Sequence, residues 1–219
     1  ALLAAGVGLC AAPLLRLLPT GTLRLAPGLP TVVALRGLVA CAFFGAEAYI
    51  PLTLTRLQGG TARTVGIPLT IASLGWSAAS WVQGRRNTGR IGSLQVGFGL
   101  GATGVGLLVL ITRPWASLFL TIPIWTLAGA GIGLVMPLAS VLLLELSPEA
   151  EQGANSAALQ LADMTGTVVG IAAVATLVNG LGLHRLSTAA AIGDLLLAGV
   201  ALFGALVASR AVASPPTVS

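Results

Sequence analysis

The stretch PWASLFLTIPIWTLAGAGIGLVMPLASVLLL, residues 114–144, runs for 31 positions without a charged residue. An α-helix needs about 20 apolar residues to cross the hydrocarbon core of a bilayer, so this stretch is long enough to span a membrane. Residues 64–84 and 91–112 are also free of charge. The chain is 56% hydrophobic and 8% charged, whereas soluble domains carry about 25% charged residues. The sequence therefore predicts an all-α integral membrane protein with several spans.

Seven apolar segments are separated by short stretches rich in glycine, proline and polar residues. The segments are continuous rather than alternating, which favours helices over the strands of a barrel. Residues 1–18 are predicted to end a membrane helix whose start is missing, and residues 19–30 to form a cytoplasmic linker. Residues 31–209 are predicted to form a six-helix bundle, and residues 210–219 a disordered cytoplasmic tail. The six spans are expected at residues 31–55, 64–83, 91–112, 115–144, 155–179 and 187–209.

The eleven basic residues are all arginine, and their distribution predicts an orientation. Cytoplasmic loops of membrane proteins carry an excess of basic residues. If the spans alternate in direction, seven arginines fall on the side of the linker and the C-terminus, and four fall on the other side. This bias places the C-terminus in the cytoplasm. No basic run exceeds two residues, so the net charge of +5 does not indicate a nucleic-acid partner.

Small residues and prolines recur inside the predicted spans. Small residues four positions apart let membrane helices approach closely, and interior prolines kink a helix. Kinked helices are common in proteins that move between states. The glycine pairs are Gly97/Gly101, Gly129/Gly133 and Gly166/Gly170, and the prolines are Pro51, Pro68, Pro123 and Pro137.

Glu47, Asp163 and Asp194 are the acids that fall within the predicted spans. Charge inside a bilayer is costly, so such residues usually face a partner or a transport path. Glu47 lies nine residues before the arginine that ends its apolar run, about 13 Å inside the outer boundary and close to mid-membrane. Phe43 and Phe44 lie one turn before it, so we expect Glu47 among aromatic rings, where it would take up a proton near neutral pH. The alternative is a structural acid paired with an arginine of another helix.

Asp163 belongs to a polar stripe on the sixth segment. Its members recur at offsets of 0, 4, 7 and 11, which places them on one helix face. Cavity lining and hydrogen bonding between helices would each account for this face. Asp194 has no polar companion on its own face, and a local hydrogen bond or an interfacial position would account for it. The stripe consists of Ser156, Gln160, Asp163 and Thr167.

The aromatic residues divide by predicted depth. Trp81 and Trp115 fall near span boundaries, where tryptophan anchors helices at the membrane interface. Five deeper aromatic residues are expected to form an apolar wall for a lipophilic ligand, with lipid-facing bulk as the alternative. The candidate wall consists of Phe43, Phe44, Tyr49, Trp76 and Trp125.

No combination of residues indicates an enzyme, a cofactor or a metal site. His184 is the only histidine, and Cys10 and Cys41 lie in apolar runs with no metal-ligand spacing. The segment Gly97-Phe-Gly-Leu-Gly101 lies inside a predicted span and has no strand before it, so it is not expected to bind a dinucleotide. We therefore expect no catalytic residues, no metal and no cofactor.

Three stretches resemble the C-terminal half of a major facilitator superfamily transporter, most closely the drug/proton antiporter type of actinobacteria. They are FFGAEAYIP at residues 43–51, LGWSAASWVQGR at residues 74–85, and GAGIGLVMP at residues 129–137 followed by ELSPEAEQGANS at residues 145–156. The resemblance covers about residues 31–209. It rests on a pattern of helices and small residues, so it indicates the superfamily rather than the substrate.

The resemblance implies two inverted three-helix repeats and a substrate site near mid-membrane, between this half and an N-terminal half. It implies that the first, second, fourth and fifth helices of the half lie nearest that site. This would bring Glu47, Trp76, Trp125 and Asp163 to the cavity or to the interface with the other half, and would leave the helix of Asp194 peripheral.

A loop motif of the superfamily has the form Gly-x-x-x-Asp-Arg-x-Gly-Arg. The corresponding loop here keeps its glycines and arginines, but the acid is missing, which places a charge relay at this loop in doubt. The residues that match the motif are Gly84, Arg85, Arg86, Gly89 and Arg90.

The expected function is secondary active transport in the plasma membrane, namely proton-coupled efflux of small lipophilic or cationic compounds by alternating access. Glu47 and Asp163 are the candidates for proton coupling. The expected partners are the lipid bilayer, the substrate, protons and the missing N-terminal half. The alternatives are a stand-alone seven-helix protein, such as a receptor or homodimeric channel, and a membrane assembly factor without transport activity.

Overall fold

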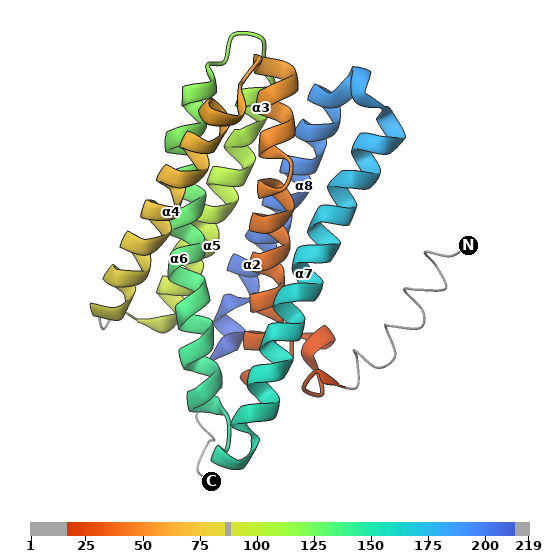
Figure 1. The fold of residues 1–219 in the computed structure, drawn as a ribbon. Helices are drawn as coiled ribbons and strands as arrows, with labels where there is room; N and C mark the ends of the chain where they lie inside the picture. The colour runs from red at the N-terminus through yellow and green to blue at the C-terminus, as the bar shows by residue number, and fades with distance from the viewer. Residues whose placement is uncertain (1–16, 86–88, 213–219) are drawn as a thin grey trace.

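The computed structural model describes residues 17–85 and 89–212, which are all helix, turn or loop (Figure 1). Short 3-10 turns precede or extend most helices, for example at Thr22–Arg24, Leu118–Leu120 and Ala208–Ala211. No strand occurs in these two ranges. The α-helices are α2 (Leu29–Glu47), α3 (Ile50–Gln58), α4 (Ala62–Arg85), α5 (Arg90–Leu107), α6 (Thr121–Leu146), α7 (Gln152–Leu181) and α8 (Leu186–Val207).

Six helical segments are long and apolar enough to cross a membrane, as expected for a multi-pass membrane protein. They coincide with the six predicted spans and extend most of them by a few residues at each end. The predicted segment 1–18 lies outside the described residues except for its last two positions. The segments are Leu29–Gln58, Ala62–Arg85, Arg90–Thr112, Leu118–Leu146, Glu149–Leu181 and Leu183–Ala211.

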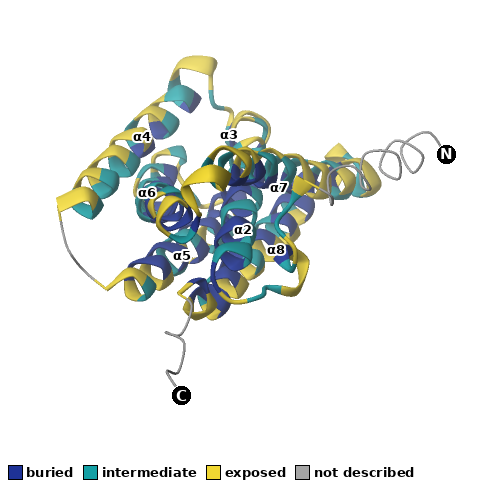
Figure 2. Ribbon diagram, turned by 90° about the horizontal axis from the view of Figure 1, so that it is seen from below, coloured by how far each residue is buried: buried dark blue, intermediate teal, exposed yellow. Residues whose placement is uncertain are grey.

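The central pair of the bundle is α2 and α6, with α4 and α7 on one side and α5 and α8 on the other (Figure 2). In the most apolar 18-residue window of α2–α3 and of α6, 61% of the residues are buried. The same fraction is only 17% for α4 and 22% for α7. The main packing partners are α2 with α7, α4 with α6, α5 with α6 and α8, and α2 with α8. Two helices on the same side of the bundle are therefore left with broad exposed faces.

Glycines of α6 bring its backbone against two neighbours at once. A Cβ atom on Gly129 would lie 2.6 Å from the carbonyl oxygen of Ala72, and one on Gly133 would lie 2.5 Å from that of Trp76. On the opposite face, a Cβ atom on Gly131 would lie 2.5 Å from the backbone nitrogen of Gly101. These contacts confirm the predicted role of small residues, and they set how closely α4 and α5 pack on α6.

The contact between α2 and α7 is closer still. A Cβ atom on Gly166 would lie 2.1 Å from the carbonyl oxygen of Gly37, and one on Gly170 would lie 2.2 Å from that of Cys41. No side chain larger than hydrogen fits at either α7 position unless the two backbones separate. The predicted Gly166/Gly170 pair is therefore the site at which α7 packs on the central helix.

Prolines interrupt the helices as predicted at two places. Pro137 lies inside α6 and has no amide to donate to the carbonyl of Gly133, but the Ser80 hydroxyl of α4 donates to that carbonyl instead, at 2.9 Å. Pro51 follows a break between α2 and α3 at Ala48 and Tyr49, and it removes the amide that would otherwise bond to the carbonyl of Glu47. The span that carries Glu47 is thus two helices rather than one.

The prediction that disorder begins at residue 210 is wrong for the described part of the tail. Ala208–Ala211 forms a 3-10 turn, Ala211 is fully buried, and the carbonyl of Arg210 accepts a 2.8 Å hydrogen bond from the Gly28 amide. This bond ties the end of the last span to the start of the first. Residues 213–219 lie outside the described residues.

Replacement of Gly166 by alanine tests the α2–α7 contact. Because the added methyl group meets backbone rather than a side chain, we expect a loss of about 1–3 kcal/mol, or about 3–10 °C in the melting temperature of the detergent-purified protein. The matched control is Gly199→Ala in α8, where a Cβ atom meets nothing within 4 Å. Equal melting temperatures for the two variants would contradict the close approach of α2 and α7.

Candidate functional site

An ion pair between Arg36 of α2 and Asp163 of α7 connects helices far apart in the sequence. The Arg36 Nη2 donates to Asp163 Oδ2 at 3.3 Å, and the two side chains are 12% and 18% exposed. The Arg36 Nη1 donates to the carbonyl oxygen of Met136 at 3.0 Å and to Ser140 Oγ at 3.3 Å, both on α6. One guanidinium therefore bridges three helices inside the bundle.

The glycine contact explains why the two charges meet. Arg36 precedes Gly37, whose carbonyl lies against Gly166, and Gly166 is one helical turn after Asp163. The close approach of the backbones leaves these two side chains within reach of each other. The sequence analysis counted Arg36 among the arginines that set orientation, but the structure places it inside a span with a protein partner.

The ion pair is incompletely hydrogen-bonded. Arg36 Nε and Asp163 Oδ1 are both buried without a hydrogen-bond partner. A buried polar atom without a partner carries a desolvation penalty of about 1–3 kcal/mol, and more when the group is charged. Gln58 Oε1 and Thr121 Oγ1 are buried without a partner among the described residues in the same way, so this property is not peculiar to the Arg36–Asp163 pair.

The members of the predicted polar stripe differ in burial. Ser156, Asp163 and Thr167 are half-buried, whereas Gln160 is exposed on the described part of the chain. Of the two explanations for the stripe, hydrogen bonding between helices accounts for Asp163. Sequence analysis missed the buried Asn155, whose Nδ2 donates to Ser147 Oγ at 3.0 Å across the α6–α7 connection.

Four of the five predicted aromatic residues come together around Phe43. Its ring stacks on Trp125 with centroids 4.5 Å apart, and the rings of Phe44 and Trp76 pack edge-on at 5.3 and 5.8 Å. Trp125 is fully buried and Phe43 is 4% exposed, so the prediction that these two line a ligand cavity is wrong, as is the lipid-facing alternative. They are core residues that fill the space between α2 and α6.

Phe44 and Trp76 are half-buried and remain candidates for an apolar wall. Tyr49 is separate from the cluster, because it lies in the break between α2 and α3. It makes no ring contact with another aromatic residue among the described residues. The structure therefore reduces the predicted five-residue wall to two residues.

Glu47 is half-buried and forms the last residue of α2. It lies close to the middle of its span and slightly towards the Gln58 end, because the span runs from Leu29 to Gln58. No hydrogen bond or ion pair to its carboxylate occurs among the described residues. The alternative of an arginine partner for Glu47 is thus not realised within this part of the chain, and Arg36 is committed to Asp163.

The loop motif gains a partner that sequence analysis did not predict. Gly84 and Arg85 end α4, Gly89 precedes α5, and Arg86 lies outside the described residues. Arg90 forms a two-bond ion pair with Glu145, whose second bond, Nη2 to Oε1, is 2.7 Å long. Glu145 therefore supplies a carboxylate that the loop itself lacks. Both side chains are largely exposed, so the pair contributes little stability.

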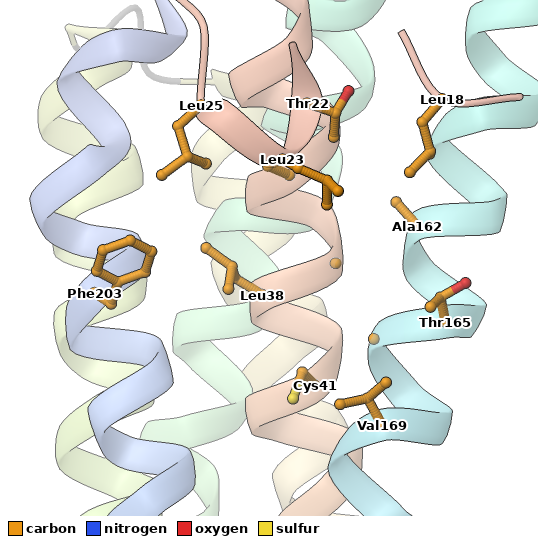
Figure 3. Close-up of a pocket in the computed structure, with 13 residues that line it drawn as sticks. Leu18, Thr22, Leu23, Leu25, Leu38, Cys41, Ala162, Thr165, Val169 and Phe203 are labelled. Atoms are coloured by element: carbon orange, nitrogen blue, oxygen red, sulfur yellow. The ribbon is translucent and has the colours of Figure 1, made fainter. Parts of the chain in front are cut away.

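A cavity of about 370 Å³ lies between α2, α7, α8 and the turn at Thr22–Arg24 (Figure 3). Its lining is apolar apart from Thr22 and Thr165 and contains none of the predicted site residues. Ligand sites need a few well-placed polar groups to orient what they bind. The Thr22 hydroxyl already donates to the Pro19 carbonyl, so this cavity lacks such a set. Among the described residues, no three histidine, cysteine or acidic side chains lie close enough to hold a metal ion.

Comparison of the chain with protein-family models, with curated proteins and with solved structures finds no match. The resemblance noted from the sequence therefore stays a prediction.

Removal of one partner tests whether Arg36 depends on Asp163. In Asp163→Leu the guanidinium stays buried without its counter-charge, so we expect a loss of about 3–5 kcal/mol of stability, measured as thermal unfolding in detergent. The double variant Arg36→Leu/Asp163→Leu should recover most of this loss, because no charge is left unpaired. Glu145→Gln is the control, since it breaks an exposed pair and should cost about 1 kcal/mol or less. If the double variant were no more stable than Asp163→Leu, the two charges would not depend on each other.

Proposed function

We propose that this chain is one half of a proton-coupled secondary transporter of the major facilitator type, and that the Arg36–Asp163 pair is its coupling site. The observation that carries the proposal is a mostly buried charged pair that joins α2 to α7 inside the bundle. Ionisable groups within membrane spans usually mark a transport path.

The coupling step follows from the geometry of the pair. When Asp163 takes up a proton, its attraction for Arg36 falls, and the link between α2 and α7 weakens. Arg36 keeps its hydrogen bonds to Met136 and Ser140 of α6, so the contact that weakens is the one with α7. A cationic compound that approaches Asp163 would compete with Arg36 in the same way. Protons and substrate would then act on one acid in turn, as antiport requires.

The packing pattern supports two equivalent three-helix units. The first unit would consist of α2, α4 and α5, and the second of α6, α7 and α8 in the same order. If each helix is replaced by its counterpart in the other unit, the α2–α7 contact corresponds to α6–α4, and the α2–α8 contact corresponds to α6–α5. Both members of each pair of contacts are present. This is the relation expected of inverted repeats, in which the transport site lies between two such bundles.

Polar side chains on the exposed faces of α4 and α7 support the proposal that these faces meet another half of the transporter. Thr70, Ser73 and Ser77 are exposed on one face of α4, and each hydroxyl donates to a carbonyl of its own helix. Gln160 is exposed on α7. Such side chains suit a water-filled cavity better than lipid.

The orientation rests on fewer residues than the sequence suggested. With Arg36 inside the bundle, the arginines at described helix ends divide evenly, with Arg24, Arg85, Arg90 and Arg210 at one end and Arg56, Arg63, Arg113 and Arg185 at the other. We keep the proposal of a plasma-membrane protein with a cytoplasmic C-terminus. It depends on Arg16 and Arg86, which lie outside the described residues.

The proposal is tested by transport in proteoliposomes that contain the complete gene product. With an imposed pH gradient and ethidium as a lipophilic cation, Asp163→Asn should reduce gradient-driven transport at least tenfold, because asparagine cannot exchange a proton. Glu145→Gln should transport at the wild-type rate, since its carboxylate lies in an exposed pair.

Glu47→Gln separates the two candidate acids. Glu47 has no ion-pair partner among the described residues, so its protonation would release no contact between helices. We therefore expect transport by this variant to remain driven by the pH gradient. If Glu47→Gln rather than Asp163→Asn loses the response to the gradient, Glu47 is the coupling acid and Asp163 is structural. If neither does, the coupling proposal fails.

A further inference from the structure

Asp194 of α8 faces a small internal void on the other side of the bundle's mid-plane from the Arg36–Asp163 pair. Val174 of α7 also lines this void and is eleven residues beyond Asp163, or about 16 Å at helical rise. The void offers about 10 Å³ to the centre of a water molecule, which is the room that one water needs. Sequence analysis treated Asp194 as lacking polar companions, but the structure supplies them from another helix.

The lining of this void contains oxygen donors and acceptors but no cation. Asp194, Tyr49 and Thr53 are its polar side chains, and the remaining lining residues are apolar. The lining comes from α2, the α2–α3 break, α3, the turn Leu108–Thr112, α7 and α8. Among the described residues that line the void, Tyr49 is the one titratable group besides Asp194. None of the three polar side chains has a hydrogen-bond or ion-pair partner among the described residues.

An ionised Asp194 would be unstable in this setting. An isolated carboxylate in a low-dielectric interior carries a penalty of several kcal/mol unless it is paired, and no arginine or histidine lines the void. A neutral carboxylic acid carries no such penalty, and it needs one acceptor for its O–H and a donor for its C=O. The hydroxyls of Tyr49 and Thr53, with a single water, provide both.

The break between α2 and α3 gives this acid a route to water. The Tyr49 amide donates to the carbonyl of Ala46 at 3.1 Å, three residues back rather than four, so regular α-helical bonding is interrupted beside the void. Ala48, within the break, is exposed. A small opening at this point would connect Asp194 to solvent.

We propose that Asp194 is a second proton-binding site, held as a neutral acid in the void formed with Tyr49 and Thr53 and reached through the α2–α3 break. The proton sits on a carboxylate oxygen and leaves to water when the break opens. This site does not rest on the proposed transport function, because it is defined by the protonation of one carboxyl group.

Infrared spectroscopy of the reconstituted protein tests the site directly, since the C=O stretch of a protonated carboxyl is separate from the bands of carboxylate and amide. At pH 7, wild-type protein should show this band, and it should shift in D2O because the acid exchanges its proton. The protein for these measurements carries Glu47→Gln, so that Glu47, which also lacks a partner among the described residues, adds no carboxyl band. On this background Asp194→Asn should remove the band. Asp163→Asn should leave it unchanged, which separates this site from the coupling pair. Thr53→Val and Tyr49→Phe should shift the band without removing it, because each deletes a hydrogen-bond partner of a group that stays protonated.

Three results would overturn the proposal. One is an Asp194→Asn spectrum that keeps the wild-type carboxyl band. Another is loss of the wild-type band on adding NaCl at constant pH, which would show that the void holds Na⁺ and a carboxylate. The third is a band that stays unshifted after long incubation in D2O, which would mean that the acid is sealed from water. Asn and Asp have the same shape, so Asp194→Asn is expected to fold. If it does not, the Thr53→Val spectrum serves as an independent check.

Discussion

The backbone contact between α2 and α7 is the constraint on which the candidate site depends. Gly166 and Gly170 let the two helices approach until only hydrogen fits between them, and this brings Arg36 and Asp163 together. A wider separation would leave a guanidinium and a carboxylate without each other inside an apolar bundle. The same residues therefore set the helix packing and permit the buried charges. In lipid, where apolar burial gives no net drive for helices to associate, such close van der Waals contacts take that role.

The charged groups of the bundle fall into three environments with different consequences. The Arg90–Glu145 pair is exposed, and solvent screens it. The Arg36–Asp163 pair is mostly buried and joins α2 to α7, so protonation of the acid would change the force between these two helices. Asp194 is half-buried beside the hydroxyl groups of Tyr49 and Thr53, and no cation among the described residues lines its void, which favours a neutral acid. The environment, rather than the residue type, distinguishes the roles of these acids.

Helical hydrogen bonding is interrupted at Pro137 and at the α2–α3 break, with different outcomes. At Pro137 the Ser80 hydroxyl of α4 donates to the freed carbonyl of Gly133, so α4 and α6 stay connected there. At the α2–α3 break the side chains of Tyr49 and Thr53 make no such hydrogen bond among the described residues. A side chain of another helix therefore replaces the lost helical bond at Pro137 but not at the α2–α3 break. This difference agrees with a rigid α4–α6 unit and an adjustable outer end of the Leu29–Gln58 span.

The sequence by itself determined the six spans, their helical nature and the glycine positions that pack them, because hydrophobic run length and small-residue spacing are local properties of the chain. It also identified Asp163 and the aromatic residues that gather around Phe43. It could not assign partners, since the distances from Arg36 to Asp163, from Arg90 to Glu145 and from Asp194 to Thr53 depend on how separate helices are arranged. For the same reason it placed Trp125 at a cavity, whereas packing against Phe43 buries it completely. Only the tertiary structure decides which buried polar group meets a partner, because that choice is made across helix interfaces rather than along the chain.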